Sequence, residues 1–441
     1  MKKKITEVNI IGGGLAGVEC AYLLANHGIK VNLYEMKPTK FSPAHKSPTL
    51  AEVVCSNSFK NTDKLTSSGL LKAEMEAFGS LVLKVANETS VPAGGALAVD
   101  RDKFSCRVDE IIRKHKNIQV IEKEITEFPL EKDEIWVIAT GPLTSDALSA
   151  DIKAKIGEED LHFFDASAPI VLGETVDKTS AFKQDRYGEL GSGDYLNCPM
   201  TKEEYQEFYN ALISAERAEL HEFEKGEIFE GCMPIEVMAL RGEDALRYGP
   251  LKPVGLGRHL AYKPHAIVQL RKENLDEECY NLVGFQTNLK FGEQKRVFSL
   301  IPALKNAEFI KYGVMHKNSY LNSPKVLNKD LSLKKFKNVF IAGQLSGVEG
   351  YMESASMGIA VALSIIARNN GRELSLGGET MMGSLINYIT NPANGDNFQP
   401  MNSNYGIIKE LENKTRDKKE NRLKIYERSI ETIERLEKEN K

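Results

Sequence analysis

The chain has 441 residues, with 58 Lys and Arg against 62 Asp and Glu and a formal net charge of −4. Its 41% apolar and 27% charged residues are typical of a globular protein of roughly two or three domains and exclude disordered and fibrous classes. The acidic total excludes a chain that is basic throughout, but not a local basic face that binds nucleic acid.

The sequence predicts a cytoplasmic protein with no membrane segment. The best candidate for a membrane span, residues 358–367, is too short to cross a bilayer. The six cysteines include no CxxC pair, so they do not form a disulfide framework and reduced thiols are expected. The eight histidines show no spacing typical of metal ligands, and we predict no metal site.

The first 35 residues predict the start of a nucleotide-binding domain. Residues 5–11 form an apolar, β-branched run typical of a buried strand, and this run leads into GGGLAG. A helical pattern follows and ends at His27-Gly28, where glycine suits the end of a helix. A second apolar strand, residues 31–34, ends at Glu35.

Gly12, Gly14 and Gly17 have the GxGxxG spacing of a dinucleotide fingerprint. The first glycine permits a tight turn, the second lets a pyrophosphate approach the backbone, and the third lets helix and strand pack closely. A carboxylate at the end of the second strand would accept ribose hydroxyls. We therefore predict cofactor-binding roles for Gly12, Gly13, Gly14, Leu15, Ala16, Gly17 and Glu35. The alternative is a glycine-rich turn that holds no ligand.

Two further apolar strands are predicted later in the chain, at residues 135–139 and 339–342. The second leads into a glycine-rich turn and a helix near 354–367, an arrangement that commonly closes over the flavin end of FAD. Gly343 and Gln344 are therefore predicted to bind the cofactor, and the paired motifs favour FAD over NAD.

These elements predict an α/β fold: a Rossmann-like FAD-binding domain of the two-motif flavoprotein type, with an α+β insertion domain. The FAD-binding domain is predicted to be discontinuous, built from residues 1–185 and 311–441, with 186–310 as the insertion.

Two helices are predicted outside the nucleotide-binding motifs. Residues 201–222 have helical spacing, with Thr201 and Glu204 as a possible capping box. The charged tail predicts an amphipathic helix docked on the body, whose apolar face is Leu423, Tyr426, Ile430 and Ile433. The basic runs are interpreted as solvated faces that would form a phosphate track if they converged: 37–46, 334–337 and 414–424.

Cys55 and Cys232 are candidate reactive cysteines. Cys55 lies in EVVCSNSF among polar residues and near Lys46 and Lys60, a setting that can stabilise a thiolate, and Cys232 lies in a loop bounded by glycine and proline. An isolated cysteine is more often a small buried apolar residue. We interpret Cys20 and Cys279 in that way and leave Cys106 and Cys198 open.

The chain resembles the folate/FAD-dependent tRNA (uracil-5-)-methyltransferase family over nearly its whole length. The matching segments are GGGLAGVE at 12–19, YEMKP at 34–38, EVVCSNSF at 52–59, GALAVDRDKFS at 95–105, ATGPLTS at 139–145, FDASAPI at 164–170, FEGCMPIE at 229–236, ALRYGPLKPVGL at 245–256 and AGQLSGVEGYMESASMG at 342–358. Many relatives have Ala in place of Gly13, a change that is not expected to affect phosphate binding.

The resemblance implies a reaction. Enzymes of this family take a one-carbon unit from 5,10-methylenetetrahydrofolate and use reduced FAD to deliver it to C5 of a uridine in the tRNA T-loop, with NADH or NADPH as reductant. Uracil C5 becomes nucleophilic when a thiolate adds at C6, and a base must then remove the C5 proton. The resemblance makes Cys55 and Cys232 the two functional cysteines. Which one adds to the base stays open, with Cys55 favoured. By analogy with base-flipping enzymes, the uridine is expected to be extruded.

Other functions remain open on the sequence alone. The same chemistry could act on a ribosomal RNA uridine. A flavoprotein that modifies the tRNA wobble uridine shares the fold but is markedly longer. An NAD(P)H-dependent flavin oxidoreductase of a small molecule would need neither Cys55 nor Cys232, and a flavin-binding regulatory protein would show no folate-dependent turnover. The oligomeric state, monomer or weak dimer, is not determined.

Overall fold

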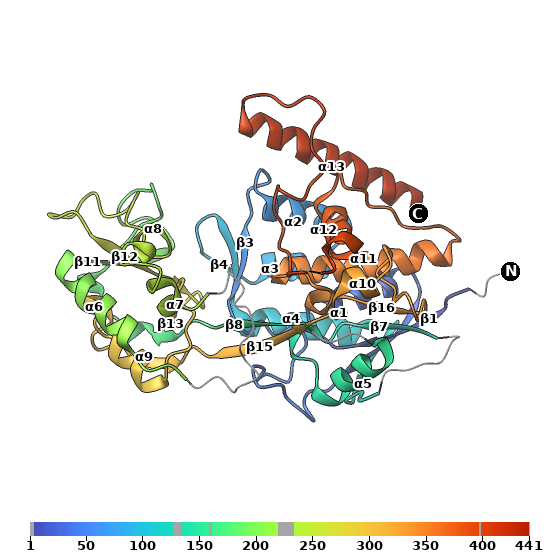
Figure 1. The fold of residues 1–441 in the computed structure, drawn as a ribbon, viewed down its shortest axis with the longest axis horizontal. Coiled ribbons are helices and arrows are strands. Elements are labelled where there is room, and N and C mark those ends of the chain that lie inside the picture. Colours follow the sequence, from blue (N-terminus) through green and yellow to red (C-terminus); the bar gives the residue numbers. More distant parts are fainter. Residues whose placement is uncertain (1–3, 128–133, 158–160, 219–232, 397, 441) are drawn as a thin grey trace.

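The protein is described from a computed structural model, which covers residues 4–127, 134–157, 161–218, 233–396 and 398–440. Figure 1 shows two units side by side, with the long C-terminal helix lying across the larger one. Each unit has its own principal hydrophobic cluster, and the cluster of the smaller unit is drawn from residues 168–309.

The larger unit is built on a parallel sheet. Its five strands lie in the order β16 (Val339–Ile341), β7 (Ile135–Ile138), β1 (Glu7–Ile11), β2 (Lys30–Glu35) and β6 (Ile118–Glu122). Every neighbouring pair is parallel. The four strands predicted from apolar runs are β1, β2, β7 and β16, and the predicted α/β Rossmann-like class is confirmed. Strand β6 is not among the strands predicted from the sequence.

Helices α1 (Leu15–Asn26) and α11 (Tyr351–Asn369) pack tightly against each other beside this sheet. A Cβ on Gly358 would lie 2.1 Å from the Ala16 carbonyl oxygen, so glycine is required where the two helices cross. This crossing brings the N-terminus of α11 close to the glycine turn that precedes α1.

The remaining helices of the larger unit are α2 (Ser67–Ala77), α3 (Leu81–Glu88), α4 (Arg101–Lys114), α5 (Asp146–Ile156), α10 (Ser323–Val326), α12 (Met381–Thr390) and α13 (Lys418–Asn440). A small antiparallel sheet joins β3 (Ser58–Asn61), β5 (Ala96–Val99) and β4 (Ser90–Val91). Two antiparallel strands run between the units, β8 (Leu161–Ala166) and β15 (Met315–Tyr320).

The smaller unit is built on an antiparallel sheet. Its six strands lie in the order β10 (Phe182–Lys183), β11 (Tyr195–Met200), β12 (Ala266–Lys272), β13 (Cys279–Leu282), β9 (Ile170–Leu172) and β14 (Phe309–Lys311). Its helices are α6 (Lys202–Ser214), α7 (Ile235–Ala239), α8 (Ala245–Tyr248) and α9 (Phe291–Phe298). Because β9 and β10 precede residue 186, we propose that this unit starts earlier than the insertion predicted at 186–310.

The predicted helix at 201–222 is correct at its start and wrong at its end. Helix α6 begins with the capping box of Thr201 and Glu204. It ends at Ser214 because Ala215 has extended backbone, with ψ 145°. Residues 219–222 lie outside the described part of the chain.

Helix α13 docks on α2 through a face that is only partly the predicted one. Ile433 is fully buried, whereas Leu423 is 44% exposed. The centre of the face is Ser429, whose hydroxyl donates a 2.5 Å hydrogen bond to Glu74 of α2. The Glu74 carboxylate also accepts hydrogen bonds from the first two amides of α12, at 2.6 and 2.8 Å. One buried carboxylate thus ties three helices together.

Replacing Glu74 with Gln is expected to reduce the pH dependence of stability. Burial raises the pKa of Glu74 from 4.5 to about 7, against the opposing effect of Ser429 and the two amides. Because the folded-state pKa is the higher one, the linked stability is complete below pH 4.5 and is lost as pH rises through about 7. This contribution amounts to roughly 3 kcal/mol. Urea unfolding at several pH values from 4.5 to 8 should therefore show a smaller decline for Glu74→Gln. An equal decline in both proteins would contradict the assignment.

None of the helices in the described ranges combines the length and the apolar character that a membrane crossing requires.

Candidate functional site

A large cavity opens where the carboxyl ends of β1, β2, β7 and β16 meet the N-termini of α1 and α11. The space between its lining residues is about 1320 Å³, a figure that includes space open to solvent. Most of the predicted site residues line it, namely Gly12, Gly13, Gly14, Leu15, Ala16, Glu35, Cys55, Gly343 and Gln344. Gly17 does not line the cavity, and Cys232 lies outside the described residues.

The glycine turn has the geometry that its sequence predicts. Gly12 has φ +103°, and a Cβ there would lie 2.6 Å from the Ala139 carbonyl oxygen. A Cβ on Gly17 would lie 1.9 Å from the Gly12 carbonyl oxygen, so Gly17 serves packing of α1 against the turn. Gly14 faces open space, and no side chain caps the first turn of α1 behind it. This helix N-terminus can therefore accept an anion.

Glu35 organises the turn as well as facing the cavity. Its carboxylate accepts hydrogen bonds from the Gly13 amide at 2.8 Å and the Lys37 amide at 3.0 Å. A carboxylate has about four acceptor positions, so two remain for the donors of a ligand in the cavity. Gly13 is more constrained than expected: a Cβ there would lie 2.4 Å from Leu50 Cδ2, so Ala at this position requires Leu50 to move.

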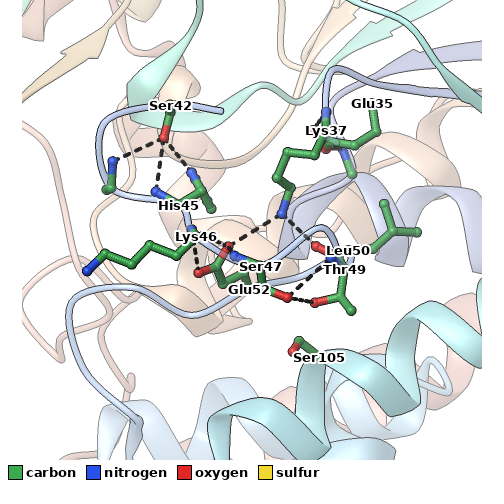
Figure 2. A network of polar contacts seen from close by, with 12 residues as sticks. Glu35, Lys37, Ser42, His45, Lys46, Ser47, Thr49, Leu50, Glu52 and Ser105 are labelled. Atoms are coloured by element: carbon green, nitrogen blue, oxygen red, sulfur yellow. Dashed lines mark hydrogen bonds and ion pairs between the residues drawn. The ribbon is translucent and has the colours of Figure 1, made fainter. Parts of the chain in front are cut away.

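The segment that covers this end of the cavity, residues 36–54, is held by the polar network in Figure 2. Lys37 is 4% exposed, and its ammonium donates to the Thr49 carbonyl at 2.5 Å and pairs with Glu52 at 3.6 Å. The interpretation of residues 37–46 as a solvated face is therefore wrong at Lys37. Burial, and then the charge of Lys37, lower the pKa of His45, so this cavity-lining imidazole is neutral at pH 7.

The second predicted motif lies directly against the first. Gly343 has φ +77° and begins the 3₁₀ turn Gly343–Ser346, and a Cβ on it would lie 2.8 Å from Ala16 Cβ. Helix α11 starts at Tyr351, earlier than the predicted 354, after a Gly350 that provides no side-chain cap. Tyr351 and Ser354 line the cavity, so the first turn of α11 borders it.

Cys55 is half-buried and lies against Tyr351 at the edge of this cavity. The tyrosine hydroxyl oxygen accepts hydrogen bonds from the Cys55 amide at 2.9 Å and the Ser56 amide at 3.2 Å. The same oxygen lies 3.0 Å from the Cys55 Sγ atom. Two amides occupy the acceptor positions of this oxygen, so its proton is directed to the sulfur. Burial, followed by the charge of Cys55, raises the pKa of Tyr351 well above its ordinary value, so the phenol keeps that proton.

Replacing Tyr351 with Phe is expected to make Cys55 less reactive. The lost O–H donor stabilises the thiolate more than the thiol, so alkylation of Cys55 by iodoacetamide at pH 7 should slow by about tenfold. Peptide mass spectrometry assigns the modified cysteine. Tyr22→Phe, in α1 with its ring packed against His115, is the matched control and should leave the rate unchanged. Equal rates in all three proteins would contradict a hydrogen bond to the sulfur.

Tyr351 and Arg101 are not among the site residues predicted from the sequence. Both lie inside segments that match the family, 342–358 and 95–105. Arg101 is the first residue of α4, and a cation there opposes the helix dipole. An arginine at this unfavourable position indicates, from the sequence alone, that its side chain has a role other than stabilising the helix. Its guanidinium donates to the carbonyls of Val53 and Val54, immediately before Cys55.

The other described cysteines lie away from this cavity. Cys20 and Cys198 are fully buried in the two hydrophobic clusters, and burial raises the pKa of both thiols far above the ordinary value. Cys279 is half-buried with a raised pKa, chiefly from burial, and Cys106 is exposed. Within the described ranges, no group of three or more His, Cys, Asp or Glu residues is placed to hold a metal ion.

Comparisons with known proteins give consistent results. Residues 7–373 match the model of the family described as Glucose inhibited division protein A. The methylenetetrahydrofolate--tRNA-(uracil-5-)-methyltransferase TrmFO of Caldicellulosiruptor bescii is 54% identical over 434 residues, 98% of each chain. The protein of the same name from Lactobacillus johnsonii is 50% identical over 99% of each chain, and that from Fusobacterium nucleatum is 52% identical over 97% of this chain and 98% of its own.

Among solved structures, Aquifex aeolicus GidA in its form II crystal superposes with a TM-score of 0.70. It is 17% identical, and the match covers 98% of this chain and 72% of that chain, which establishes a shared fold. Together with the identities of 50% or more, these matches confirm the resemblance inferred from the motifs. The chain belongs to the methylenetetrahydrofolate--tRNA-(uracil-5-)-methyltransferase family.

Proposed function

We propose that this protein methylates C5 of a uridine in tRNA, with 5,10-methylenetetrahydrofolate as the one-carbon donor and FAD as its cofactor. The observation that carries the proposal is the position of Cys55. Its thiol lies against the Tyr351 hydroxyl, at the edge of the same cavity that the glycine turn lines. The names of the relatives supply the substrates. We place the reaction in the cytoplasm, where tRNA and folate are available.

The residues of the cavity fit FAD. The open space at Gly14, in front of an uncapped helix N-terminus, suits the pyrophosphate, and the acceptor positions left on Glu35 suit ribose hydroxyls. Gly343, Gln344 and the N-terminus of α11 would lie against the flavin, where negative charge develops on reduction. When bound, the reduced flavin supplies the hydride that completes the methyl group.

The proposed step at Cys55 is addition of its thiolate to uracil C6. The S–C6 bond forms as the C5–C6 π electrons move toward C5 and O4, and this makes C5 the nucleophile for the one-carbon unit. Loss of the C5 proton to a base and release of the thiolate restore the ring. The Tyr351 hydroxyl stabilises the thiolate both before addition and on release. Cys232 is the second proposed functional cysteine, and the choice of Cys55 as the nucleophile is part of this proposal.

Three finer points also belong to the proposal. The target uridine is the one in the T-loop, NADH or NADPH reduces the flavin, and the base is extruded before reaction because the folded loop otherwise blocks access to C6. Basic side chains near the junction of the two units hold phosphates, so RNA affinity should fall steeply with added salt.

The test is a methylation assay on the purified flavin-containing protein with methylenetetrahydrofolate and NADPH or NADH. An unmodified tRNA transcript and a ribosomal RNA fragment are supplied in parallel reactions, and nucleosides are analysed by mass spectrometry. We expect 5-methyluridine in the tRNA alone. Product only in the ribosomal fragment would overturn the substrate, and consumption of NADPH without methylation of either RNA would favour a small-molecule oxidoreductase.

A further inference from the structure

Two cations from different units hold the backbone immediately before Cys55. Arg101, at the start of α4 in the larger unit, donates from Nη1 to the Val53 carbonyl at 2.9 Å and the Val54 carbonyl at 3.0 Å. Lys311, at the end of β14 in the antiparallel sheet, donates from Nζ to the same Val54 carbonyl at 3.0 Å. The position of the Cys55 segment therefore depends on how the antiparallel sheet docks against α4.

Glu273, the residue after β12, fixes the Arg101 guanidinium. Its carboxylate accepts from Nε at 2.6 Å and from Nη2 at 3.3 Å, and the two side chains are 16% and 9% exposed. A bidentate pair of this kind sets the orientation of the guanidinium plane, which a single contact would not. The Arg101 guanidinium thus binds Glu273 of the smaller unit through Nε and Nη2, and binds the backbone that precedes Cys55 through Nη1.

The charges around Cys55 are predominantly positive. Burial, and then the charge of Arg101, lower the pKa of Lys311 to about 8, so the ammonium is still largely protonated at pH 7. The negative charge of Cys55 acts in the opposite direction and raises the pKa of both Lys311 and Arg101. A Coulomb interaction is mutual, so these two cations favour the Cys55 thiolate by the same energy. Within the part of the chain that the structure describes, the charged or titratable groups of this neighbourhood include Arg101, Lys311, Lys46, Arg271, Glu273 and Tyr351.

We propose that Arg101, Lys311 and Glu273 are positioning residues for Cys55. The two cations hold the thiol at the cavity edge and favour its thiolate, and Glu273 orients Arg101 while moderating the positive charge. Docking of the two units thereby sets the reactivity of the cysteine. The inference depends on the proposed function only in taking Cys55 as the reacting thiol. A purely mechanical role for the three side chains is the alternative.

The test is the pH profile of Cys55 alkylation by iodoacetamide in the full-length flavin-containing protein. Lys311→Met removes a cation and should move the midpoint upward by about one pH unit, with about tenfold slower alkylation at pH 7. Lys311→Arg keeps the charge and should restore the wild-type midpoint. Glu273→Gln removes a carboxylate and should move the midpoint downward. Exposed Cys106, read from the same peptide maps, is the internal reference.

If the alkylation midpoint rises in Lys311→Met and falls in Glu273→Gln, the electrostatic role is established. A loosened backbone alone would not shift the midpoint upward when a cation is lost and downward when a carboxylate is lost. Unchanged midpoints, or shifts of the same direction in both variants, would overturn that role. If Lys311→Met loses flavin or unfolds, the Glu273→Gln midpoint decides alone. The methylation assay is a separate readout: midpoints that move as expected in a protein that methylates no tRNA would refute the proposed function and leave this inference intact.

Discussion

Replacing Cys55 with Ala is expected to reduce methyl transfer to tRNA by at least about a thousandfold while the protein keeps its flavin. The thiol is the only nucleophilic atom that the variant loses. In the proposed function the glycine turn and Glu35, which lie on other elements than Cys55, hold the cofactor. Turnover is measured with a tRNA transcript, and flavin content is measured by absorbance after denaturation.

The matched control is Cys106→Ala, which removes an exposed thiol of α4 outside the cavity and should retain full activity. If Cys55→Ala methylates tRNA within a few-fold of the wild-type rate, the thiol has no chemical role. If Cys55→Ala loses its flavin, its loss of activity says nothing about nucleophilic addition, and the thiol alkylation series decides the question.

Replacing Gly14 with Val is expected to weaken flavin binding strongly without unfolding the protein. Gly14 has φ −74°, a conformation open to any residue, and a Cβ there would meet no atom within 4 Å. The isopropyl group would instead stand in front of the α1 N-terminus, where we propose that the pyrophosphate approaches the backbone. We expect flavin affinity to fall by about a hundredfold or more, measured by titrating the apoprotein with FAD and following flavin fluorescence.

Gly292→Val provides the control for this substitution. Gly292 lies in the first turn of α9 in the smaller unit, and a Cβ there also meets nothing within 4 Å, but no part of the cavity is nearby. Its flavin affinity should equal that of the wild type. Wild-type flavin affinity in Gly14→Val would contradict the assignment of this helix N-terminus to the pyrophosphate.

The parts of the fold that were predicted correctly are those with a strong local pattern. Four strands of the parallel sheet contain short, mostly apolar runs, and the capping box at Thr201 marks the start of α6. The end of α6 was missed because its polar and apolar spacing continues beyond the residue where the backbone becomes extended. Leu423 was assigned to the docked face of α13 for a similar reason, since periodicity does not reveal that Ser429 and Glu74 set the contact.

In the candidate site, too, the residues predicted correctly are those that a local sequence pattern brings together. The glycine turn and Glu35 lie within one strand–helix–strand unit, so spacing alone brings them together. Tyr351 lies 296 residues from Cys55, and Lys311 lies 257 residues from Val54. Contacts at such separations arise only from tertiary packing, which a single sequence does not encode in any local pattern. Cys232 was predicted with the same reasoning as Cys55 and stays a prediction.

The most direct test of the central claim is to trace the carbon. The protein is incubated with tRNA transcript, NADPH and methylenetetrahydrofolate whose methylene carbon is ¹³C, with no other methyl donor present, and the nucleosides are then analysed by mass spectrometry. The proposed function predicts 5-methyluridine that contains the heavy carbon, and none from Cys55→Ala that retains its flavin. Unlabelled 5-methyluridine, or labelled product from Cys55→Ala at the wild-type rate, would contradict it.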